Sequence, residues 1–409
     1  MEVLYLKVLQ INVSNGSGST GRNCLEISDY LTENNHESYI ACSKGEGFDN
    51  EILIGSKLEK KFHALLSRVF GNQGYYSKLG TYKLIRQIKK INPDIIHLNT
   101  LHSNYINLKI LFDNINKMKI GTVITLHDTW FYTGKCCHYN NVNCYKWKES
   151  CGECPLLKED NPSWFFDRTK KNLADKKKWY EKLNTLAVIG VSDWITNEAK
   201  ESILKSATYI SRIYNWIDLE TFKPYSVDII KKENGFDSEF VILGVASIWG
   251  ERKGIKRFIE LSQNISNDTK IVLIGKIKNN QELPENIINI PEINDQKILA
   301  KYYSMADVFI NFSLEESFGK VTAEALACGT PTIVYNSTAN PEIVGKGCGY
   351  VLDDNRIELV IEKINEIKKN GKEHYSENCI QYSNEKFNKE DRLKEIIDVY
   401  EKVIKENEN

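Results

Sequence analysis

The sequence predicts an α/β protein built from two doubly wound domains, each a parallel sheet with helices on both faces. Two observations lead to this fold class. Apolar, strand-like runs alternate with amphipathic runs of helical length along the first half of the chain, and the same alternation restarts near residue 240. The length of 409 residues suits two or three domains of roughly 150 residues each.

The expected strands are short runs of aliphatic and β-branched residues. They are Val3–Val13, Ser38–Cys42, Asp94–Leu98, Thr122–Leu126 and Leu186–Val191, and then Phe240–Ala246, Lys270–Ile274, Asp307–Asn311 and Thr332–Tyr335. Between strands, Gly21–Asn34 and Thr81–Lys90 carry apolar residues at helical spacing. Ligands of such sheets bind beyond the carboxyl ends of the strands, and two such domains that face each other form a cleft.

On this interpretation the chain has four parts. Residues 1–213 form the first domain, with a cysteine-rich insert at 133–158, and residues 236–387 form the second. The less regular stretch 214–235 is expected to be a linker. Residues 388–409 have the pattern of one long helix, which could cross back to the first domain.

Charge and composition exclude several classes of protein. The chain has 54 Lys and Arg against 55 Asp and Glu, whereas a nucleic-acid binder usually carries a large basic excess. No apolar run approaches the roughly 18 residues of a membrane span, and the first residues lack the basic start of a signal peptide. Ten cysteines are too few for a disulfide scaffold, so we expect reduced thiols or metal ligands in a cytoplasmic protein.

A glycine-rich loop, Asn15–Gly21, follows the first strand and precedes the first helix. Gly16 and Gly18 would let backbone amides approach a ligand closely, and the N-terminus of the helix favours an anion. The spacing matches neither the dinucleotide nor the phosphate-loop fingerprint. A flexible turn is the alternative interpretation.

His127 and Asp128 stand at the end of the strand Thr122–Leu126, where a doubly wound domain places its ligands. His127 could donate a hydrogen bond to a substrate oxygen, with Asp128 fixing its tautomer. The alternative is a histidine that a local carbonyl satisfies.

Arg252 and Lys253 lie in a loop bounded by Gly250 and Gly254, after the first strand of the second domain. Two cations at such a place can neutralise a pyrophosphate leaving group, the task that Mg²⁺ performs in other enzymes. A solvated basic turn is the alternative.

The most specific motif is EESFGKVTAEA, residues 315–325. Glu316 lies in a loop, and Glu324 falls on the following helix, where a carboxylate can accept both hydroxyls of a ribose. The small Ser317 and Gly319 leave the N-terminus of that helix open to an anion. Surface solvation of the two carboxylates is the alternative.

At these residues the chain resembles the family 4 glycosyltransferases, which have the GT-B fold of two Rossmann-like domains facing a cleft. The match covers nearly the whole length. Its strongest part, Glu316–Pro331, follows the family pattern E-G-F-G…E-A-x-A-C-G-x-P, with Ser317 in place of a common Gly. The resemblance implies a retaining transfer from a nucleotide sugar, with no cofactor required for catalysis.

The resemblance also implies roles for residues of the second domain. Glu316 would contact the transferred sugar, Glu324 would bind the ribose, and amides around Phe318 and Gly319 would hold the phosphates.

Two further roles come with a departure from the family pattern. The resemblance places His127 against the donor sugar near the reaction centre and gives Lys253 a phosphate. Many members carry Arg where this chain has Ser247, and Arg252 could replace that charge.

The segment Thr133–Pro155 narrows the resemblance to a branch of bacterial glycosyltransferases that build colanic-acid-type exopolysaccharide, capsule or O-antigen. Four thiolates in it could form a tetrahedral structural zinc site, those of Cys136, Cys144, Cys151 and Cys154. Cys137 and His138 leave open which groups would ligate. A loop of free thiols is the alternative, and we assign the cluster no catalytic role.

A basic amphipathic stretch runs from Lys57 to Lys90, with nine Lys or Arg and a single acidic residue, Glu59. Its apolar stripe consists of Leu58, Phe62, Leu65, Leu66, Val69 and Phe70. Such a helix can lie on an anionic leaflet, and acceptors of this branch are lipid-linked sugars. We therefore expect peripheral contact with the inner face of the cell membrane. An ordinary helix packed on the sheet is the alternative.

Together these observations predict a cytoplasmic glycosyltransferase that moves a hexose or related sugar from an NDP-sugar to a hydroxyl of a glycan or lipid-linked acceptor in surface polysaccharide biosynthesis. The donor would bind mainly the second domain, and the acceptor mainly the first, near the glycine loop. Two alternatives remain, a sugar-nucleotide epimerase or hydrolase on the same scaffold and a catalytically silent scaffold protein.

Overall fold

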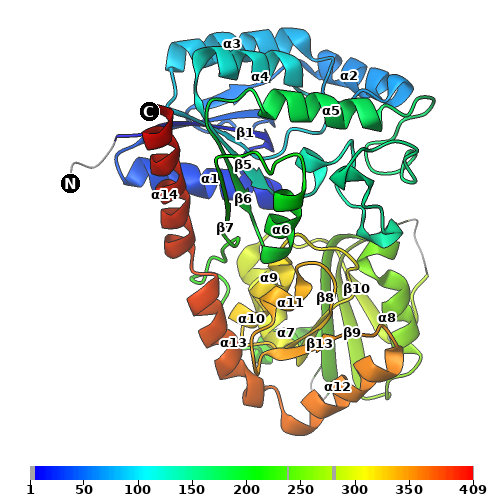
Figure 1. Ribbon diagram of the computed structural model, residues 1–409. Coiled ribbons are helices and arrows are strands. Elements are labelled where there is room, and N and C mark those ends of the chain that lie inside the picture. The colour runs from blue at the N-terminus through cyan, green and yellow to red at the C-terminus, as the bar shows by residue number, and fades with distance from the viewer. Residues whose placement is uncertain (1–4, 237–238, 279–281, 409) are drawn as a thin grey trace. The chain divides into compact units, whose positions relative to one another are not determined.

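The computed structural model describes residues 5–236, 239–278 and 282–408, which form two compact units (Figure 1). The first unit comprises the described residues up to Ile213 together with those from Leu393 onwards, and the second comprises Tyr214–Arg392. Each unit has its own parallel sheet flanked by helices, which confirms the predicted α/β class.

Within the described residues, the first unit has a sheet of seven parallel strands in the order β3-β2-β1-β4-β5-β6-β7. The strands are β1 (Lys7–Ser14), β2 (Glu37–Lys44), β3 (Glu51–Leu53), β4 (Ile95–Leu98), β5 (Gly121–Leu126), β6 (Leu186–Gly190) and β7 (Tyr209–Arg212). Every residue of β4, β5 and β6 is buried, as expected for central strands covered on both faces. The strand order reverses between β1 and β4, which is where doubly wound sheets bind ligands.

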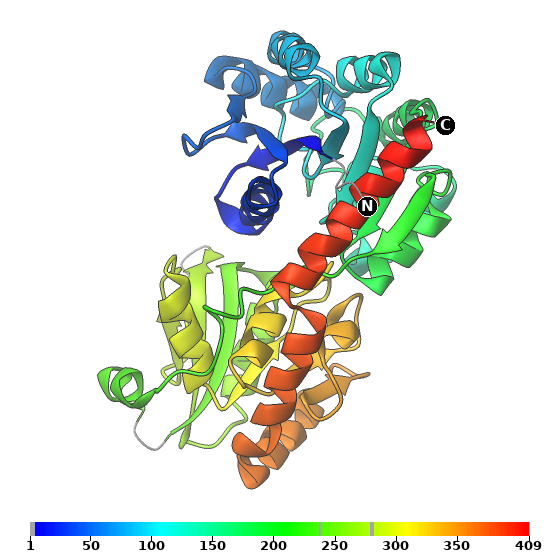
Figure 2. The same ribbon diagram turned by 90° about the vertical axis from the view of Figure 1, so that its left-hand side faces the viewer.

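Helices of the first unit are amphipathic and cover both faces of the sheet. They are α1 (Gly18–Glu33), α2 (Lys57–Phe70), α3 (Lys78–Ile91), α4 (Leu108–Met118), α5 (Thr169–Tyr180) and α6 (Asp193–Glu201), joined by most of α14 (Lys389–Glu408). In Figure 1, α3 and α4 lie on one side of the sheet and α1 on the other. Figure 2 shows α14 as one long helix, as the sequence predicts.

The cysteine-rich insert lies between β5 and α5 and contains only short 3-10 turns in the described structure. These turns are η1 (Trp130–Tyr132), η2 (Asn140–Val142) and η3 (Lys146–Lys148). Its shape therefore depends on side-chain contacts and not on a regular backbone ladder.

The second unit has a sheet of six parallel strands in the part of the chain that the structure describes, in the order β10-β9-β8-β11-β12-β13. The strands are β8 (Phe240–Trp249), β9 (Thr269–Ile277), β10 (Ile287–Ile290), β11 (Val308–Asn311), β12 (Thr332–Tyr335) and β13 (Gly349–Leu352). Its helices are α7 (Asp228–Asn234), α8 (Ile255–Ser262), α9 (Gln296–Met305), α10 (Lys320–Ala327), α11 (Asn340–Ile343), α12 (Ile357–Asn370) and α13 (Glu373–Lys386), with the 3-10 turn η4 (Glu251–Lys253).

Each strand expected from the sequence corresponds to a strand of the structure, although the first residues of Val3–Val13 lie outside the described part. The strands that the sequence did not predict are β3, β7, β10 and β13, the two edges of each sheet. Edge strands have one neighbour and more solvent contact, so they are short and lack a long apolar run. Hydrophobic patterning therefore finds the centre of each sheet and misses its borders.

The stretch 214–235, expected to be a linker, belongs to the second unit. Trp216, Ile217 and Phe222 are buried in it, at 3%, 0% and 2% exposure. Three large apolar side chains attach this irregular segment to the second unit because their burial is favourable regardless of backbone regularity.

Candidate active site

The candidate residues of the second unit follow the carboxyl ends of β8 and β11. Lys253 ends η4, and Gly254 follows it in the left-handed region with φ of 78°. A Cβ at Gly254 would lie 2.4 Å from Phe312 Cβ and 3.0 Å from Phe312 O. Glycine at this position therefore allows η4 to pack against the end of β11.

Lys253 and Glu316 form an ion pair, with 2.5 Å between Nζ and Oε1. The Lys253 side chain is 30% exposed and that of Glu316 14%. Residues after β12 hold the Glu316 loop, since the backbone N–H of Glu316 donates to Thr338 Oγ1 (2.9 Å) and its carbonyl accepts from the Ala339 N–H (3.2 Å). Two residues predicted separately thus meet at one place.

Phe318 and Gly319 shape the start of α10. Phe318 is buried and packs edge-on against Phe387, with ring centroids 5.5 Å apart. Gly319 is the N-cap with φ of 92°, and its side-chain position is free of close contacts. Because the amides at a helix start carry partial positive charge and Ser317 before them is small, an anion can approach this end of α10.

Glu324 lies on α10 and is 4% exposed. Its Oε2 accepts a hydrogen bond of 2.9 Å from Tyr303 OH, on α9. Tyr303 could not be predicted from the sequence, because an aromatic residue on an amphipathic helix carries no signal of a partner more than twenty positions away. Glu324 thus already has one buried hydrogen-bond partner in the absence of a ligand.

Arg252, the other expected phosphate ligand, is half-buried in η4. Its carbonyl accepts from the backbone N–H of Leu314 at 3.4 Å. Arg252 therefore ties η4 to the loop that carries Glu316 through its backbone.

The glycine loop of the first unit turns the chain from β1 into α1. Gly16 and Gly18 have φ of 73° and 68°, and the Gly16 N–H donates to Gly21 O at 3.0 Å. A Cβ at Gly16 would lie 2.7 Å from Phe48 Cε2, whereas one at Gly18 would meet nothing within 4 Å. Gly16 is thus fixed by packing, and Gly18 leaves the start of α1 open.

His127 follows β5 and is half-buried, with Nε2 2.9 Å from Asn99 Oδ1. An amide oxygen only accepts, so Nε2 carries the hydrogen in this contact. Asn99 follows β4 and was not predicted from the sequence. It is 2% exposed, and its buried Nδ2 has no hydrogen-bond partner among the described residues. Asn99 thus orients the His127 ring and offers one further donor.

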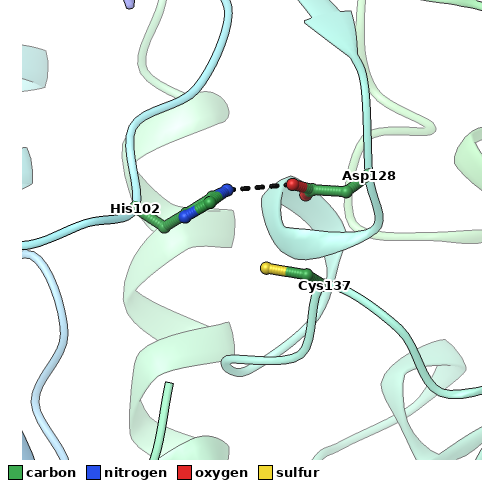
Figure 3. Close-up of side chains that lie close together, drawn as sticks. All are labelled: His102, Asp128 and Cys137. Atoms are coloured by element: carbon green, nitrogen blue, oxygen red, sulfur yellow. Dashed lines mark hydrogen bonds and ion pairs between the residues drawn. The ribbon is translucent and has the colours of Figure 1, made fainter. Parts of the chain in front are cut away.

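The expectation that Asp128 fixes the His127 tautomer is wrong. Asp128 Oδ2 accepts from His102 Nε2 at 2.9 Å (Figure 3). Its Oδ1 accepts from the Trp130 N–H at 2.8 Å. Burial raises the pKa of Asp128, but the His102 ring and the Trp130 N–H lower it to about 2. Consecutive residues leave an extended strand on opposite sides, so His127 and Asp128 take different partners.

The structure does not support the predicted zinc site. The four cysteines line one small cavity of the insert, namely Cys136, Cys144, Cys151 and Cys154. Among the described residues, however, no three of them bring their sulfurs within 4.8 Å of one another. A tetrahedral site with Zn–S bonds of about 2.3 Å needs closer sulfurs.

Two buried lysines organise the insert instead. Lys135 Nζ donates at 2.6–2.7 Å to three carbonyls, those of Leu156, Glu159 and Asp160. Lys176 Nζ lies 3.5 Å from the centre of the Trp130 ring and donates to Thr133 O at 3.0 Å. Burial lowers the pKa of Lys176 to about 7. The spacing of the cysteines is a signal in the sequence. The burial of these two lysines has no such signal, because nothing in the sequence distinguishes them from surface lysines.

Comparison with known families identifies the chain. Residues 226–386 match Glycosyl transferases group 1, and residues 20–221 match Glycosyltransferase Family 4. The chain belongs to the family 4 glycosyltransferases. It is therefore a glycosyltransferase of the GT-B fold, as the motif at 315–325 predicted.

Similar proteins include one named for colanic acid biosynthesis and one named for a cps region. The chain is 20% identical to the colanic acid biosynthesis glycosyl transferase WcaC of Escherichia coli (strain K12), over 87% of this chain and 90% of that protein. It is 23% identical to an uncharacterized 41.2 kDa protein in the cps region of Klebsiella pneumoniae, over 91% and 95%. The structure of Anabaena HepE in complex with UDP-glucose shares the fold, with a TM-score of 0.68 at 14% identity, covering 97% of this chain and 100% of HepE.

We also looked for a membrane-spanning segment among the helices that the structure describes. Across the described residues, none combines the length and the apolar character that a bilayer crossing requires.

Proposed function

We propose that this glycosyltransferase moves a sugar from a UDP-sugar to a hydroxyl of a surface-polysaccharide acceptor, with retention of the anomeric configuration. The observation that carries the proposal is the Lys253–Glu316 ion pair in front of α10. HepE is seen in complex with UDP-glucose, which supports the choice of donor. One relative is named for colanic acid biosynthesis and another for a cps region, which supports the acceptor class.

The ion pair suggests how the donor enters. Without nucleotide, Glu316 neutralises Lys253, and each side chain keeps some contact with solvent. A diphosphate is a stronger partner for the ammonium, because it carries more charge than one carboxylate. When the diphosphate binds Lys253 and the amides at the start of α10, Glu316 is released toward the hydroxyls of the transferred sugar.

The remaining roles follow the family resemblance. Glu324 binds the ribose, and residues 236–387 hold the donor, while residues 1–213 hold the acceptor near the glycine loop. His127, oriented by Asn99, donates to the donor sugar. The leaving phosphate takes the proton of the attacking hydroxyl, so no separate base is required, and Lys253 stabilises the charge that develops on the phosphate.

A thermal-shift screen followed by a transfer assay tests this function. A ligand that binds only the native state raises the melting temperature, so UDP and UDP-sugars should stabilise the protein more than GDP-, dTDP- or ADP-sugars. Sugar should then appear on a lipid-linked glycan acceptor with the α or β configuration of the donor retained. Interconversion of the donor, release of free sugar alone, or no nucleotide binding would instead indicate the epimerase, the hydrolase or the silent scaffold.

We also propose that the first unit touches an anionic membrane surface. Phe62, Leu65 and Phe70 of α2 are exposed, and the loop before α5 adds Trp164, Phe165 and Phe166. The Phe70 and Phe166 rings stack with centroids 6.1 Å apart, and Arg168 lies 5.6 Å from the Phe166 ring centre. We call these six residues the apolar patch. Basic residues beside exposed aromatic ones fit a leaflet that carries the lipid-linked acceptor.

Vesicle sedimentation tests the membrane contact. The protein should bind vesicles that contain phosphatidylglycerol and bind vesicles of pure phosphatidylcholine much less. Replacement of Phe62 and Phe165 by Ser should abolish binding, whereas Ile229→Ser, which removes an equally exposed apolar side chain of the second unit, should not. Equal loss in both variants would contradict the proposal.

A further inference from the structure

Three side chains of the first unit meet outside the roles described so far. His102, Asp128 and Cys137 bring an imidazole nitrogen, a carboxylate oxygen and a thiol sulfur within 4.8 Å of one another (Figure 3). His102 comes from the loop after β4, Asp128 from the loop after β5, and Cys137 from the cysteine-rich insert. The loop after β4 thus meets two places in the connection between β5 and α5.

We propose that His102 Nε2, Asp128 Oδ2 and Cys137 Sγ bind a divalent transition-metal ion of the Zn²⁺ or Co²⁺ kind. Mixed nitrogen, oxygen and sulfur donors suit these borderline ions, whereas Mg²⁺ and Ca²⁺ prefer oxygen alone. An ionised carboxylate and a thiolate supply the two negative charges that neutralise a dication. Three protein ligands leave the fourth tetrahedral position to water.

Further hydrogen bonds hold each ligand in place, which is the usual support of a metal site. The contacts are Ser103 Oγ to His102 Nδ1 (3.3 Å), the Trp130 N–H to Asp128 Oδ1 (2.8 Å) and Asn161 Nδ2 to Cys137 Sγ (3.4 Å). The contact at Nδ1 leaves Nε2 as the nitrogen for the ion. The amide of Asn161 donates to the sulfur and so fixes its position.

Burial also suits a bound ion. The side chains of His102 and Asp128 are 20% and 19% exposed, and Cys137 is 8% exposed. The cluster is therefore sheltered enough to strengthen the electrostatic attraction between its ligands and an ion.

A cysteine-histidine-aspartate triad for nucleophilic catalysis would use the same residue types but a different geometry. In a triad the imidazole stands between the other two groups and uses one nitrogen for each. Here Nε2 of His102 contacts Asp128, and Nδ1 contacts Ser103. No nitrogen remains to accept the Cys137 proton, so the arrangement favours ligation over nucleophilic attack.

The ion would join the insert to the strand-end loops. It would hold Asp128, the residue after His127, and so fix the loop from which His127 projects. Its role is structural, and the sugar transfer proposed above does not pass through it.

Cobalt titration of the untagged, metal-depleted full-length protein under reducing conditions tests this site. One equivalent of Co²⁺ should bind and produce the near-ultraviolet absorption that marks a thiolate–cobalt bond. Cys137→Ser should remove that band, and His102→Gln should weaken Co²⁺ binding at least tenfold. The matched control is the double variant Cys151→Ser, Cys154→Ser, which alters the neighbouring cysteines and should keep the band.

Three results would overturn the proposal. They are absence of saturable Co²⁺ binding to the wild type, a band that persists in Cys137→Ser, and a band that disappears in the double variant alone. Because Cys137→Ser could disturb folding, Asn161→Ala serves as a second test. It leaves all three ligands in place and should weaken Co²⁺ about 10–100-fold without loss of the band at saturation, and unchanged affinity would also count against the site.

Discussion

The two units assemble their polar residues in different ways. In the second unit, Glu316, the start of α10 and Glu324 lie on one loop and the helix that follows, and Lys253 joins them from the end of β8. In the first unit, the corresponding polar contacts link different strands, the loops after them and α14. His127 reaches Asn99, Asp128 reaches His102, and His97 reaches Thr125 and Tyr400.

This difference has a physical origin. A helix start with its preceding loop is a local structure, so one short motif specifies both the anion site and the carboxylate that accompanies it. The carboxyl edge of a parallel sheet is formed by residues far apart in sequence, and one step along a strand reverses the direction of a side chain. A substitution in the local site should thus disturb only that site. A substitution at the strand ends should disturb every loop that contributes a residue to the contact.

The largest effect is expected from Lys253→Ala. This change removes the proposed phosphate ligand and breaks the ion pair with Glu316, so we expect binding of the donor and of the transition state both to weaken. Loss of one such stabilising group typically lowers kcat about 10²–10³-fold, and a loss in binding multiplies it, so kcat/KM should fall by roughly 10³-fold or more.

Lys256→Ala is the matched control for Lys253→Ala. Lys256 lies one helical turn away and pairs with Glu251 at 2.5 Å, but both side chains are exposed. Steady-state kinetics with one UDP-sugar and UDP calorimetry should show near wild-type values for this variant. Equal losses in both variants would mean that general basicity, and not the Lys253 site, supports the donor.

His127→Ala should separate chemistry from nucleotide binding. His127 belongs to the first unit, whereas the nucleotide contacts proposed above belong to the second. We expect kcat to fall about 10²–10³-fold while UDP affinity stays within twofold, because the lost interaction forms chiefly near the transition state. Calorimetry with UDP and kinetics at saturating donor measure the two quantities.

His374→Ala, at an exposed histidine of the second unit, is the control for His127→Ala and should be silent. Asn99→Ala should share the kinetic defect of His127→Ala in weaker form, since Asn99 acts by orienting the ring. Normal turnover of His127→Ala would make the histidine structural.

Sequence patterning predicted the central strands and the long C-terminal helix, because each depends on local periodicity. The site residues of the second unit stay a prediction, and most of them come from one contiguous motif. Patterning missed the edge strands β3, β7, β10 and β13, where solvent contact removes the apolar signal. It also missed Tyr303 and Asn99, whose roles arise only from the partners that the fold places beside them.

The cysteine-rich insert shows the same limit in another form. Spacing favoured a site of four thiolates, but Cys137, set aside as an ambiguity, is the cysteine that meets His102 and Asp128. Of these two residues, His102 follows a different strand, β4, and lies far from the insert in sequence. Ligand spacing can be read along a chain only when one segment supplies all the ligands.

As the pH falls, the first unit should lose stability at a higher pH than the second unit. The segment up to Ile213 contains six of the seven histidines. Burial lowers the pKa of His97 to about 3, and burial lowers that of His63 to about 4. The unfolded chain takes up these protons from about pH 6.5 downward, whereas the folded unit does not. Stability therefore falls as the pH drops from about 6.5 toward 3, by about 2 kcal/mol per histidine at pH 5.

Hydrogen exchange at pH 7 and pH 5, corrected for intrinsic rates, would test this asymmetry. Protection should decrease in β4 and β5 and change less in β11 and β12. His97→Gln removes one titrating group, so the difference between the two pH values should shrink by about 2 kcal/mol. Parallel loss of protection in both units would show that other groups govern acid sensitivity.

The smallest effect is expected from Glu324→Gln, and it tests whether the second-unit site is as local as its motif. The substitution keeps the shape of the side chain and an acceptor for Tyr303 OH, but it removes the charge. A hydrogen bond to a charged group is worth roughly 1.5–3 kcal/mol, so UDP affinity should drop about tenfold or more.

Tyr303→Phe is the counterpart, because it removes the 2.9 Å contact and leaves the carboxylate. The unfolding free energy of that variant should be lower by about 1 kcal/mol, which lowers its melting temperature. Its UDP affinity should fall less than that of Glu324→Gln. Calorimetry and melting curves on both variants distinguish a ribose ligand from a buried structural carboxylate, and unchanged UDP affinity in a folded Glu324→Gln would assign Glu324 to the structural role alone.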